Sequence, residues 1–515
     1  MPLFETLLAL LLAALALSAL ARRLRIPYPA LLALGGGLAA FIPATAQFTL
    51  PPDMILALFV APVLMDAAYD VSLRDLRKNW PPISSLVLVA VALTTGVVAV
   101  VARAILPDLP WAAAIALGAL LAPPDAVSAL AVLRQLNPPH RLRMVLEGES
   151  LLNDATALLI YRLAVGAVAA GSFAPLNALP AFALVLFGSV IAGWLIGRLI
   201  GLLMKHIEDG PSSVVLQFVS TFGIWLLAEH LHLSGVVTIV VTAAVLARSR
   251  TSARLRIPSF AIWETATFVL NALAFTLIGL QVRPTFLALS GAERERYLFA
   301  ALLILLVVIF VRIAWVLTHQ GLVHWKRCVF GRSRARSSLP PTTARGAVVI
   351  ASSGMRGIVT LAAAMALPGD FPHRDFIELT AFVVVLGTLL LQGLTLRPLI
   401  AMMKLPEDRT IEAEVHTARK AALKAALAAI EGDGSPAAHR LRTEYQGALS
   451  DARKGRDPRD REENVLRQRA VAESRSAIDE LRNTDAIGDD AYRLVEEELD
   501  LLELASRPAE LADAP

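Results

Sequence analysis

The stretch E-G-E-S-L-L-N-D, residues 147–154, lies inside a segment from Leu146 to Val165 that is otherwise apolar enough to span a bilayer. An ionisable side chain at the centre of a transmembrane helix costs about 3 kcal/mol even on lenient insertion scales. Acidic side chains that are retained in a membrane-spanning segment despite this energetic cost indicate a membrane protein that transports a charged particle. On helical spacing the polar side chains fall on two neighbouring faces: Ser150 and Asp154 on one, Glu149 and Asn153 on the other.

Composition agrees with a membrane protein and divides the chain in two. Of 515 residues 56% are hydrophobic, 18% are charged, and the mean hydropathy is +0.61. Residues 1–404 carry a net charge of +12 and residues 405–515 a net charge of −8. We expect a transmembrane domain over 1–404 and a polar helical domain over 405–515. The single cysteine, Cys328, excludes an intramolecular disulfide.

Hydrophobic segments of membrane-spanning length predict about 13 transmembrane helices. The connections that face inward under this count carry 22 Lys and Arg residues and the outward ones carry 5. That asymmetry predicts an N-terminus outside and a cytoplasmic C-terminal tail. The expected spans are 3–21, 28–43, 53–69, 82–106, 111–133, 144–167, 180–203, 212–230, 233–248, 262–283, 297–319, 345–367 and 375–399.

Two of these spans carry helix-breaking residues. The fifth contains A-P-P-D at 122–125, and the twelfth contains S-S-G-M-R-G at 352–357. Their positions in the count differ by seven, an odd number, so they cross the membrane in opposite directions. The pattern predicts an all-α polytopic protein with inverted repeats, spans 1–6 and 8–13, and two crossed broken helices at a midplane site.

Several motifs resemble the sodium/proton exchanger branch of the monovalent cation:proton antiporters, in its bacterial form. Their order and spacing match along the whole transmembrane domain. The tail segment 492–500, Y-R-L-V-E-E-E-L-D, is similar to bacterial members as well. The membrane motifs are A-P-P-D-A-V-S-A-L-A-V-L (122–133), G-E-S-L-L-N-D-A-T-A (148–157), W-E-x-x-x-F-x-L-N-x-x-x-F (263–275), I-G-L-Q (278–281) and G-M-R-G-I-V-T-L-A-A-A (354–364).

The resemblance implies a thirteen-span homodimer in the bacterial cytoplasmic (inner) membrane, with a dimerisation bundle, a six-helix core and a part in pH homeostasis. Its Asn-Asp pair matches Asn153 and Asp154, with Asp154 as the shared sodium and proton site, and members with this pair exchange ions electroneutrally. Members commonly have Thr-Asp-Pro where this chain has Pro124-Asp125-Ala126. The missing threonine hydroxyl leaves the choice among Na⁺, Li⁺ and K⁺ open.

The chemistry of the residues leads to the same mechanism. In a low-dielectric cavity a proton and a small hard cation compete for the oxygens of one carboxylate, here Asp154. Ser150, Asp125 and the backbone carbonyl of Pro124 offer further oxygens, so Na⁺ is expected at Asp154, Ser150 and Asp125. If only the neutralised site crosses between inward-open and outward-open states, exchange of Na⁺ or Li⁺ for H⁺ follows without a cofactor.

Other charged residues have supporting roles in this prediction. Arg356 cannot carry the proton, because a guanidinium stays charged. We expect it to pair with Glu149 and hold the crossed helices in register, a snorkelling arginine being the alternative. Asp66 is read as an accessory acid near the cytoplasmic mouth or a helix cap, and Glu264 as a gate or an interface anchor. Arg312 is expected to be structural.

The sequence also bears on three other functional classes. A K⁺/H⁺ antiporter is the main alternative, and a cation channel would need a continuous selectivity filter that is not visible. An intramembrane hydrolase is disfavoured because the histidines of the membrane domain fall in loops or at span ends, so no enzyme is expected. We expect monovalent cations, protons, membrane lipids and a second copy of the chain as partners, and no nucleic acid.

Overall fold

The computed structural model describes residues 2–24, 26–42, 54, 56–125, 128–129, 133, 138–170, 175–249, 252–280, 291–330, 343–406, 408, 410–454, 457, 462–484 and 486–506. These residues form helices and their connections, without a strand among them. The chain divides into two compact units, Met1–Glu407 and Asp408–Pro515.

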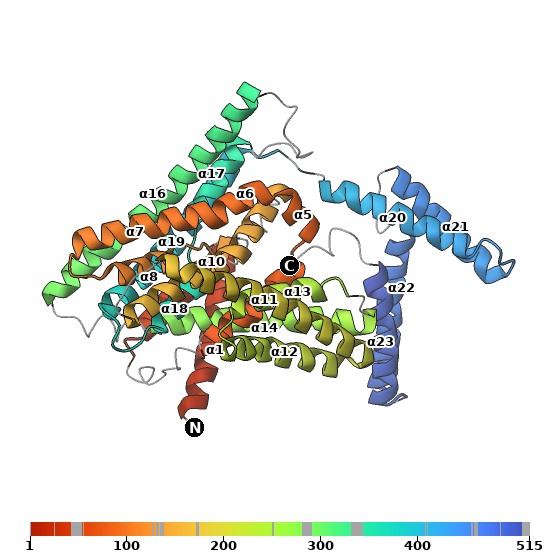
Figure 1. Cartoon of the computed structure of the whole chain (residues 1–515). Coiled ribbons are helices and arrows are strands. Elements are labelled where there is room, and N and C mark those ends of the chain that lie inside the picture. The colour runs from red at the N-terminus through yellow and green to blue at the C-terminus, as the bar shows by residue number, and fades with distance from the viewer. Residues whose placement is uncertain are drawn as a thin grey trace. The chain divides into compact units, whose positions relative to one another are not determined.

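The first unit is built of apolar helices (Figure 1). Seven of the described helical segments are long and apolar enough to cross a bilayer, and three shorter apolar helices accompany them. Each predicted span overlaps a described helix, and the count of thirteen transmembrane helices stays a prediction. The elements are α1 (Pro2–Leu24), α2 (Tyr28–Ala39), η2 (Leu56–Val60), α4 (Ala61–Asp70), α5 (Leu73–Lys78), α6 (Trp80–Ser84), η3 (Ser85–Ala90), α7 (Val91–Ile105), α8 (Trp111–Leu121), α10 (His140–Ala169), α11 (Pro175–Leu203), η5 (Met204–His206), α12 (Gly210–His230), α13 (Gly235–Leu246), α14 (Ala253–Leu280), α16 (Gly291–Phe330), α17 (Ala344–Ser352), α18 (Ile358–Met365) and α19 (Arg374–Met403).

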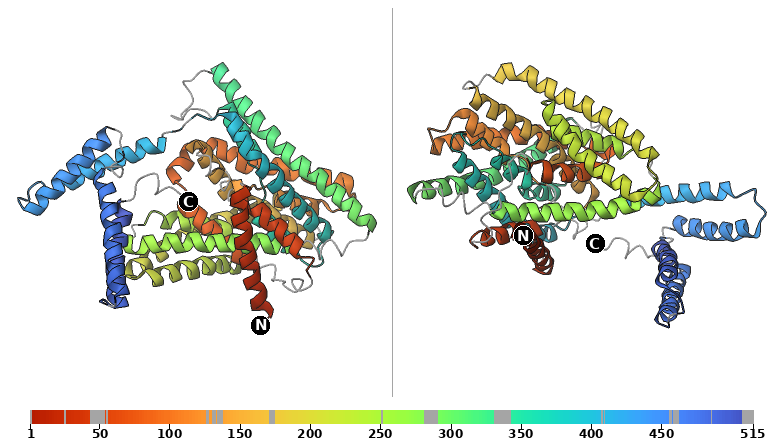
Figure 2. Two further views of the ribbon diagram at one scale, coloured as in Figure 1. Left: turned by 180° about the vertical axis from the view of Figure 1, so that it is seen from behind. Right: turned by 90° about the horizontal axis from the view of Figure 1, so that it is seen from below.

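Helix α8 is the centre of the packing. From Ala112 to Leu121 nearly every side chain is buried, and the helix is apolar on all sides, as a helix surrounded by other helices must be. It packs against α7, α10, α18 and α19. Helices α11 to α14 form a second group and pack side by side (Figures 1 and 2). Helix α4 packs on this group through its contact with α13. The candidate ion-binding site, on α10 and at the α8 and α17–α18 interruptions, therefore lies among the helices that surround α8.

Small residues bring α2 and α14 into close contact. A Cβ atom on Gly36 would lie 2.1 Å from the carbonyl oxygen of Thr276, and one on Gly279 would lie 2.3 Å from that of Ala33. Glycine allows two helix backbones to approach within van der Waals distance, which is how helices without a hydrophobic driving force associate in a bilayer. Substituting either residue would force the two helices apart.

Both predicted helix interruptions are confirmed. Helix α8 ends at Leu121, and the residues Ala122–Asp125 that follow are not helical. The second half of the fifth span lies largely outside the described residues. In the twelfth span α17 ends at Ser352 and α18 begins at Ile358, with an extended backbone at Gly357.

The second unit consists of two helical hairpins. Helices α20 (Thr410–Ala429) and α21 (Pro436–Arg453) form one, and α22 (Glu462–Asn483) and α23 (Asp489–Ser506) form the other (Figure 2). Ser435 caps α21 by accepting a hydrogen bond from the Ala438 amide at 3.1 Å, as the Ser-Pro pair at its start predicts. The corresponding Asp-Pro pair at 457–458 falls partly outside the described residues.

Candidate ion-binding site

Helix α10 places the polar residues of the opening motif inside the helical bundle. The residues Glu149, Asn153 and Asp154 are buried, with whole-residue relative exposures of 0%, 1% and 8%, and Ser150 is half-buried. The helix is continuous from His140 to Ala169, so the 3.6-residue repeat alone aims these side chains at the neighbouring helices. Three polar side chains are thus held away from lipid at one level of the bundle.

The two helix interruptions meet each other beside this level. The backbone amide of Asp125 donates to the carbonyl oxygen of Met355 at 2.6 Å. The guanidinium of Arg356 donates to the carbonyl oxygens of Leu121 at 2.9 Å and Ala122 at 3.3 Å, and also to that of Gly354. Carbonyls at a broken helix lack their helical partners and need other donors. Arg356 supplies them and joins the two broken helices.

Glu149 pairs with Arg312, and the expectation that it pairs with Arg356 is wrong. Two guanidinium nitrogens of Arg312 donate to the two carboxylate oxygens of Glu149 at 2.5 and 2.9 Å, and one donates also to the carbonyl oxygen of Ile350 at 3.1 Å. The physical reason is that Arg356 is already surrounded by freed carbonyls. Arg312, 163 residues along the chain from Glu149 on α16, is the cation that reaches it.

Asp125 stands at the end of the α8 interruption, next to α18. Its carboxylate accepts from the Ser128 hydroxyl at 2.5 Å, and a Cβ atom on Gly357 would lie only 2.4 Å from one of its oxygens. It is also near enough to Asp154 for the two carboxylates to interact electrostatically. The absence of a side chain at Gly357 therefore makes room for Asp125 beside the site.

Two side chains on α10 have oxygens that lack protein donors within the described part of the chain. Asp154 makes no hydrogen bond or ion pair there, and the side-chain oxygen of Asn153 is buried without a partner, while its nitrogen donates to Glu149 at 3.4 Å. A buried carboxylate without a counter-charge is costly unless a proton or a cation neutralises it. These oxygens can therefore bind either a proton or a cation.

Carboxylates alone do not complete a cation site here. In the described ranges no three His, Cys, Asp or Glu side chains come close enough together to hold a metal ion. A cation at Asp154 would draw its remaining ligands from amide, hydroxyl and backbone oxygens, which hard monovalent cations accept. Ser150 and the buried Pro124 supply candidates of these types.

Two accessory acids named from the sequence lie elsewhere. Asp66, on α4, lines a different cavity, between α4 and the α11–α14 group. Glu264, on α14, is exposed, as an interface anchor would be. The structure thus brings together Asp154, Asn153 and Asp125 and leaves Asp66 and Glu264 outside that cluster.

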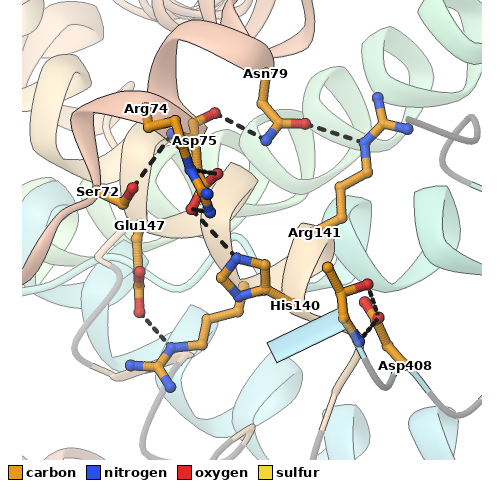
Figure 3. Close-up of polar contacts among 10 residues, drawn as sticks. Ser72, Arg74, Asp75, Asn79, His140, Arg141, Glu147 and Asp408 are labelled. Atoms are coloured by element: carbon orange, nitrogen blue, oxygen red, sulfur yellow. Dashed lines mark hydrogen bonds and ion pairs between the residues drawn. The ribbon is translucent and has the colours of Figure 1, made fainter. Parts of the chain in front are cut away.

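A polar cluster at the start of α10 was not predicted from the sequence (Figure 3). Ser72 caps α5 by accepting from the Asp75 amide at 3.3 Å, and the Asp75 carboxylate lies 3.2 Å from the Arg74 guanidinium and 3.5 Å from the His140 ring. Burial raises the pKa of Asp75, but hydrogen bonds from Arg74, Ser72 and His140 outweigh it, so the pKa lies below its usual value. The N-cap pattern at Ser72 was the one available signal.

A second contact ties the same two segments. The Arg141 guanidinium donates to the side-chain oxygen of Asn79 at 3.1 Å, and Asn79 donates to the carbonyl oxygen of Asp75 at 2.9 Å (Figure 3). These bonds fix the start of α10 to the α5–α6 connection. The helix that carries Asp154 is thereby anchored at one end.

Comparison with known proteins identifies this architecture. The transmembrane sodium/hydrogen exchanger family matches residues 7–402 of the chain. This protein belongs to that family. The exchanger is 31% identical over 511 residues to an uncharacterised Na⁺/H⁺ exchanger of Mycobacterium tuberculosis, covering 94% of this chain and 93% of the relative. It is 30% identical over 413 residues to a sodium, potassium, lithium and rubidium/H⁺ antiporter of Bacillus pumilus, covering 76% of this chain and 60% of that protein.

A solved structure has the same fold. The sodium proton antiporter MjNhaP1 from Methanocaldococcus jannaschii superposes with a TM-score of 0.60 at 17% identity, over 78% of this chain and 99% of that one. The family resemblance predicted from the motifs is confirmed, and with it an all-helical membrane protein of a transporter family. The chain thus belongs to a family of transporters, the transmembrane sodium/hydrogen exchangers.

Proposed function

We propose that this protein exchanges Na⁺ or Li⁺ for H⁺ across the bacterial cytoplasmic membrane by alternating access, with the cation and the proton competing for Asp154. The observation that carries the proposal is the buried Asp154 carboxylate, which has no donor or counter-charge in the described part of the chain. An uncompensated buried charge resists movement between inward-open and outward-open states. Binding of either ion removes the charge, so only an occupied carrier crosses.

The stoichiometry follows from the charges at the site. Glu149 is held by Arg312 in a bidentate pair and is not available to a cation. If Asp125 keeps its charge throughout, one carboxylate changes its occupant per half-cycle. Exchange is then one cation for one proton and electroneutral.

A K⁺/H⁺ exchanger is the second candidate. The relative from Bacillus pumilus is named for sodium, potassium, lithium and rubidium, and Pro124 in this chain offers only a backbone oxygen to the ion. Cation size would then be selected by carbonyl spacing rather than by a hydroxyl ligand.

The test is cation-driven proton efflux from acid-loaded proteoliposomes, with Na⁺, Li⁺ and K⁺ added in turn. We expect efflux with Na⁺ and Li⁺ that disappears in Asp154→Asn and persists in the matched control Glu264→Gln, an exposed acid on α14. A valinomycin-imposed K⁺ potential should leave the Na⁺-driven rate unchanged if exchange is electroneutral. Efflux that survives in Asp154→Asn would contradict the shared site, and ion flux without proton movement would indicate a channel.

We also propose that the exchanger is a homodimer with its N-terminus outside and residues 405–515 in the cytoplasm. The excess of Lys and Arg in the connections assigned to the inside supports this orientation. Protease digestion of inside-out and right-side-out vesicles tests it, since only inside-out vesicles should lose the tail. Native mass spectrometry of the detergent-solubilised protein tests the dimer.

A further inference from the structure

A cavity separate from Asp154 lies between α4, α11, α12, α13 and α14. It is a partly enclosed hollow that opens to the outside at one side. Most of its wall is apolar, including Met65, Ile200, Leu255, Phe260 and Trp263. The cavity is a candidate binding site that the exchange of ions at Asp154 does not use.

The polar groups around Gln217 in its wall already have partners within the protein. The side-chain oxygen of Gln217 accepts from the Ser259 hydroxyl at 2.8 Å and from the Trp263 indole at 2.7 Å. Its nitrogen donates to the Ser213 hydroxyl at 3.2 Å, and the Thr221 hydroxyl donates to the Gln217 carbonyl at 2.7 Å. Groups that already have partners gain little from a hydrophilic solute. The interior is therefore suited to an apolar chain.

The mouth of the cavity carries a cation. Arg256 is exposed and lines the cavity, and its guanidinium makes no hydrogen bond or ion pair within the described ranges. It lies at the edge of the membrane-spanning part of α14, which begins at Leu255. Lipid headgroups lie at that level, and Trp263, seven residues further along, lies about 10 Å deeper. The cavity thus offers a cation to a lipid headgroup at one end and an apolar wall to an acyl chain at the other.

We propose that this cavity binds an anionic phospholipid from the surrounding bilayer, with one acyl chain inside it and the headgroup at Arg256. Charge complementarity selects the anionic headgroup, since attraction to one Lys or Arg is worth about a fivefold gain in binding near an anionic surface. Asp66 on α4 also lines the cavity, and its carboxylate repels an anion, so the headgroup lies at Arg256 rather than beside Asp66. The bilayer supplies this amphiphile at the right depth and in high local concentration.

The experiment is native mass spectrometry of the purified exchanger after incubation with phosphatidylglycerol or phosphatidylcholine of identical chain length. We expect phosphatidylglycerol to be retained about fivefold more than phosphatidylcholine. Arg256→Gln should abolish that preference, whereas the control Arg23→Gln, an exposed arginine on α1 that does not line the cavity, should keep it. Filling the cavity with Ser220→Trp should reduce retention of both lipids.

The proposal is overturned if the wild type shows no preference, if Arg256→Gln retains it, or if Arg23→Gln removes it equally, because general surface charge would then explain the result. It is overturned as well if Ser220→Trp elutes as a folded protein and keeps as much lipid as the wild type. Arg256 is exposed, so its substitution leaves the helix packing intact and the test does not depend on the cavity-filling variant. None of these readouts requires ion exchange, so failure of the proposed function is distinguished from failure of this proposal.

Discussion

Replacing Arg312 with methionine tests which arginine neutralises Glu149. The side chains of Arg312 and Glu149 are 3% and 1% exposed, and Arg312 donates three hydrogen bonds, two to the carboxylate and one to Ile350. Removing one partner of a buried pair costs about 3 to 5 kcal/mol, because the other charge stays buried without compensation. We expect a loss of stability of that size.

The loss can be expressed as a melting temperature. Unfolding entropy near the midpoint is about 2.1 cal/mol/K per residue, so a unit spanning Met1–Glu407 has roughly 0.85 kcal/mol/K. A loss of about 4 kcal/mol then lowers Tm by about 5 °C. Tryptophan fluorescence of the detergent-purified protein during heating measures this shift, with the wild type and the variants heated at the same scan rate.

Double-mutant cycles supply the control. Glu149→Gln combined with Arg312→Met should cost about 2 kcal/mol less than the sum of the single variants, because the double variant leaves no unpaired charge. Glu149→Gln combined with Arg356→Met should lie much closer to the sum, because those side chains share no bond. A larger coupling with Arg356 than with Arg312 would refute the pairing described above.

Three further results are expected. Gly36→Ala should lower Tm by an amount corresponding to about 1 to 3 kcal/mol, because its Cβ would meet the α14 backbone at 2.1 Å, whereas Gly96→Ala, with open space around it, should be neutral or stabilising in the same thermal assay. Gly357→Ala should slow Na⁺-driven proton efflux in proteoliposomes, since the new methyl would displace the Asp125 carboxylate; a wild-type rate would show that the position of Asp125 is unimportant. Wild type should be more stable than Asp75→Asn by a constant amount above about pH 5, and this difference should decrease below about pH 4. The reason is that a carboxylate whose pKa is lowered in the folded state stabilises the fold only while it is ionised, and Asp75 becomes protonated as the pH falls. A difference that grows on acidification, measured as Tm against pH, would reverse that sign.

The residues that interrupt the helices were predictable because their effect is local. Pro123 and Pro124 remove backbone donors, and glycines on both sides of Arg356 weaken the helix there, so the breaks follow from the chain alone. Counting spans also predicted that the two interruptions lie next to each other, and the hydrogen bond from the Asp125 amide to the Met355 carbonyl agrees with that prediction. Burial of Asp154 was predictable for the same kind of reason, since an acid inside an apolar segment must face other helices.

Helix limits were predicted less well than helix existence. The eleventh span was expected over 297–319, and α16 extends from Gly291 to Phe330. Hydropathy marks only the part of a helix that lies in the hydrocarbon, while the backbone hydrogen bonds continue into polar residues beyond it. The helix is therefore longer than its apolar segment.

The sequence by itself determined that this is a polytopic membrane protein with two interrupted helices and an intramembrane carboxylate at Asp154, because spans, breaks and buried acids depend on residue type and local spacing. Only the tertiary structure decided that Glu149 pairs with Arg312, that Asp75 anchors the start of α10, and that a cavity opens beside Arg256. These contacts join helices far apart in the chain. Which of two arginines reaches a buried carboxylate depends on how the helices pack, and no periodicity within one helix records that.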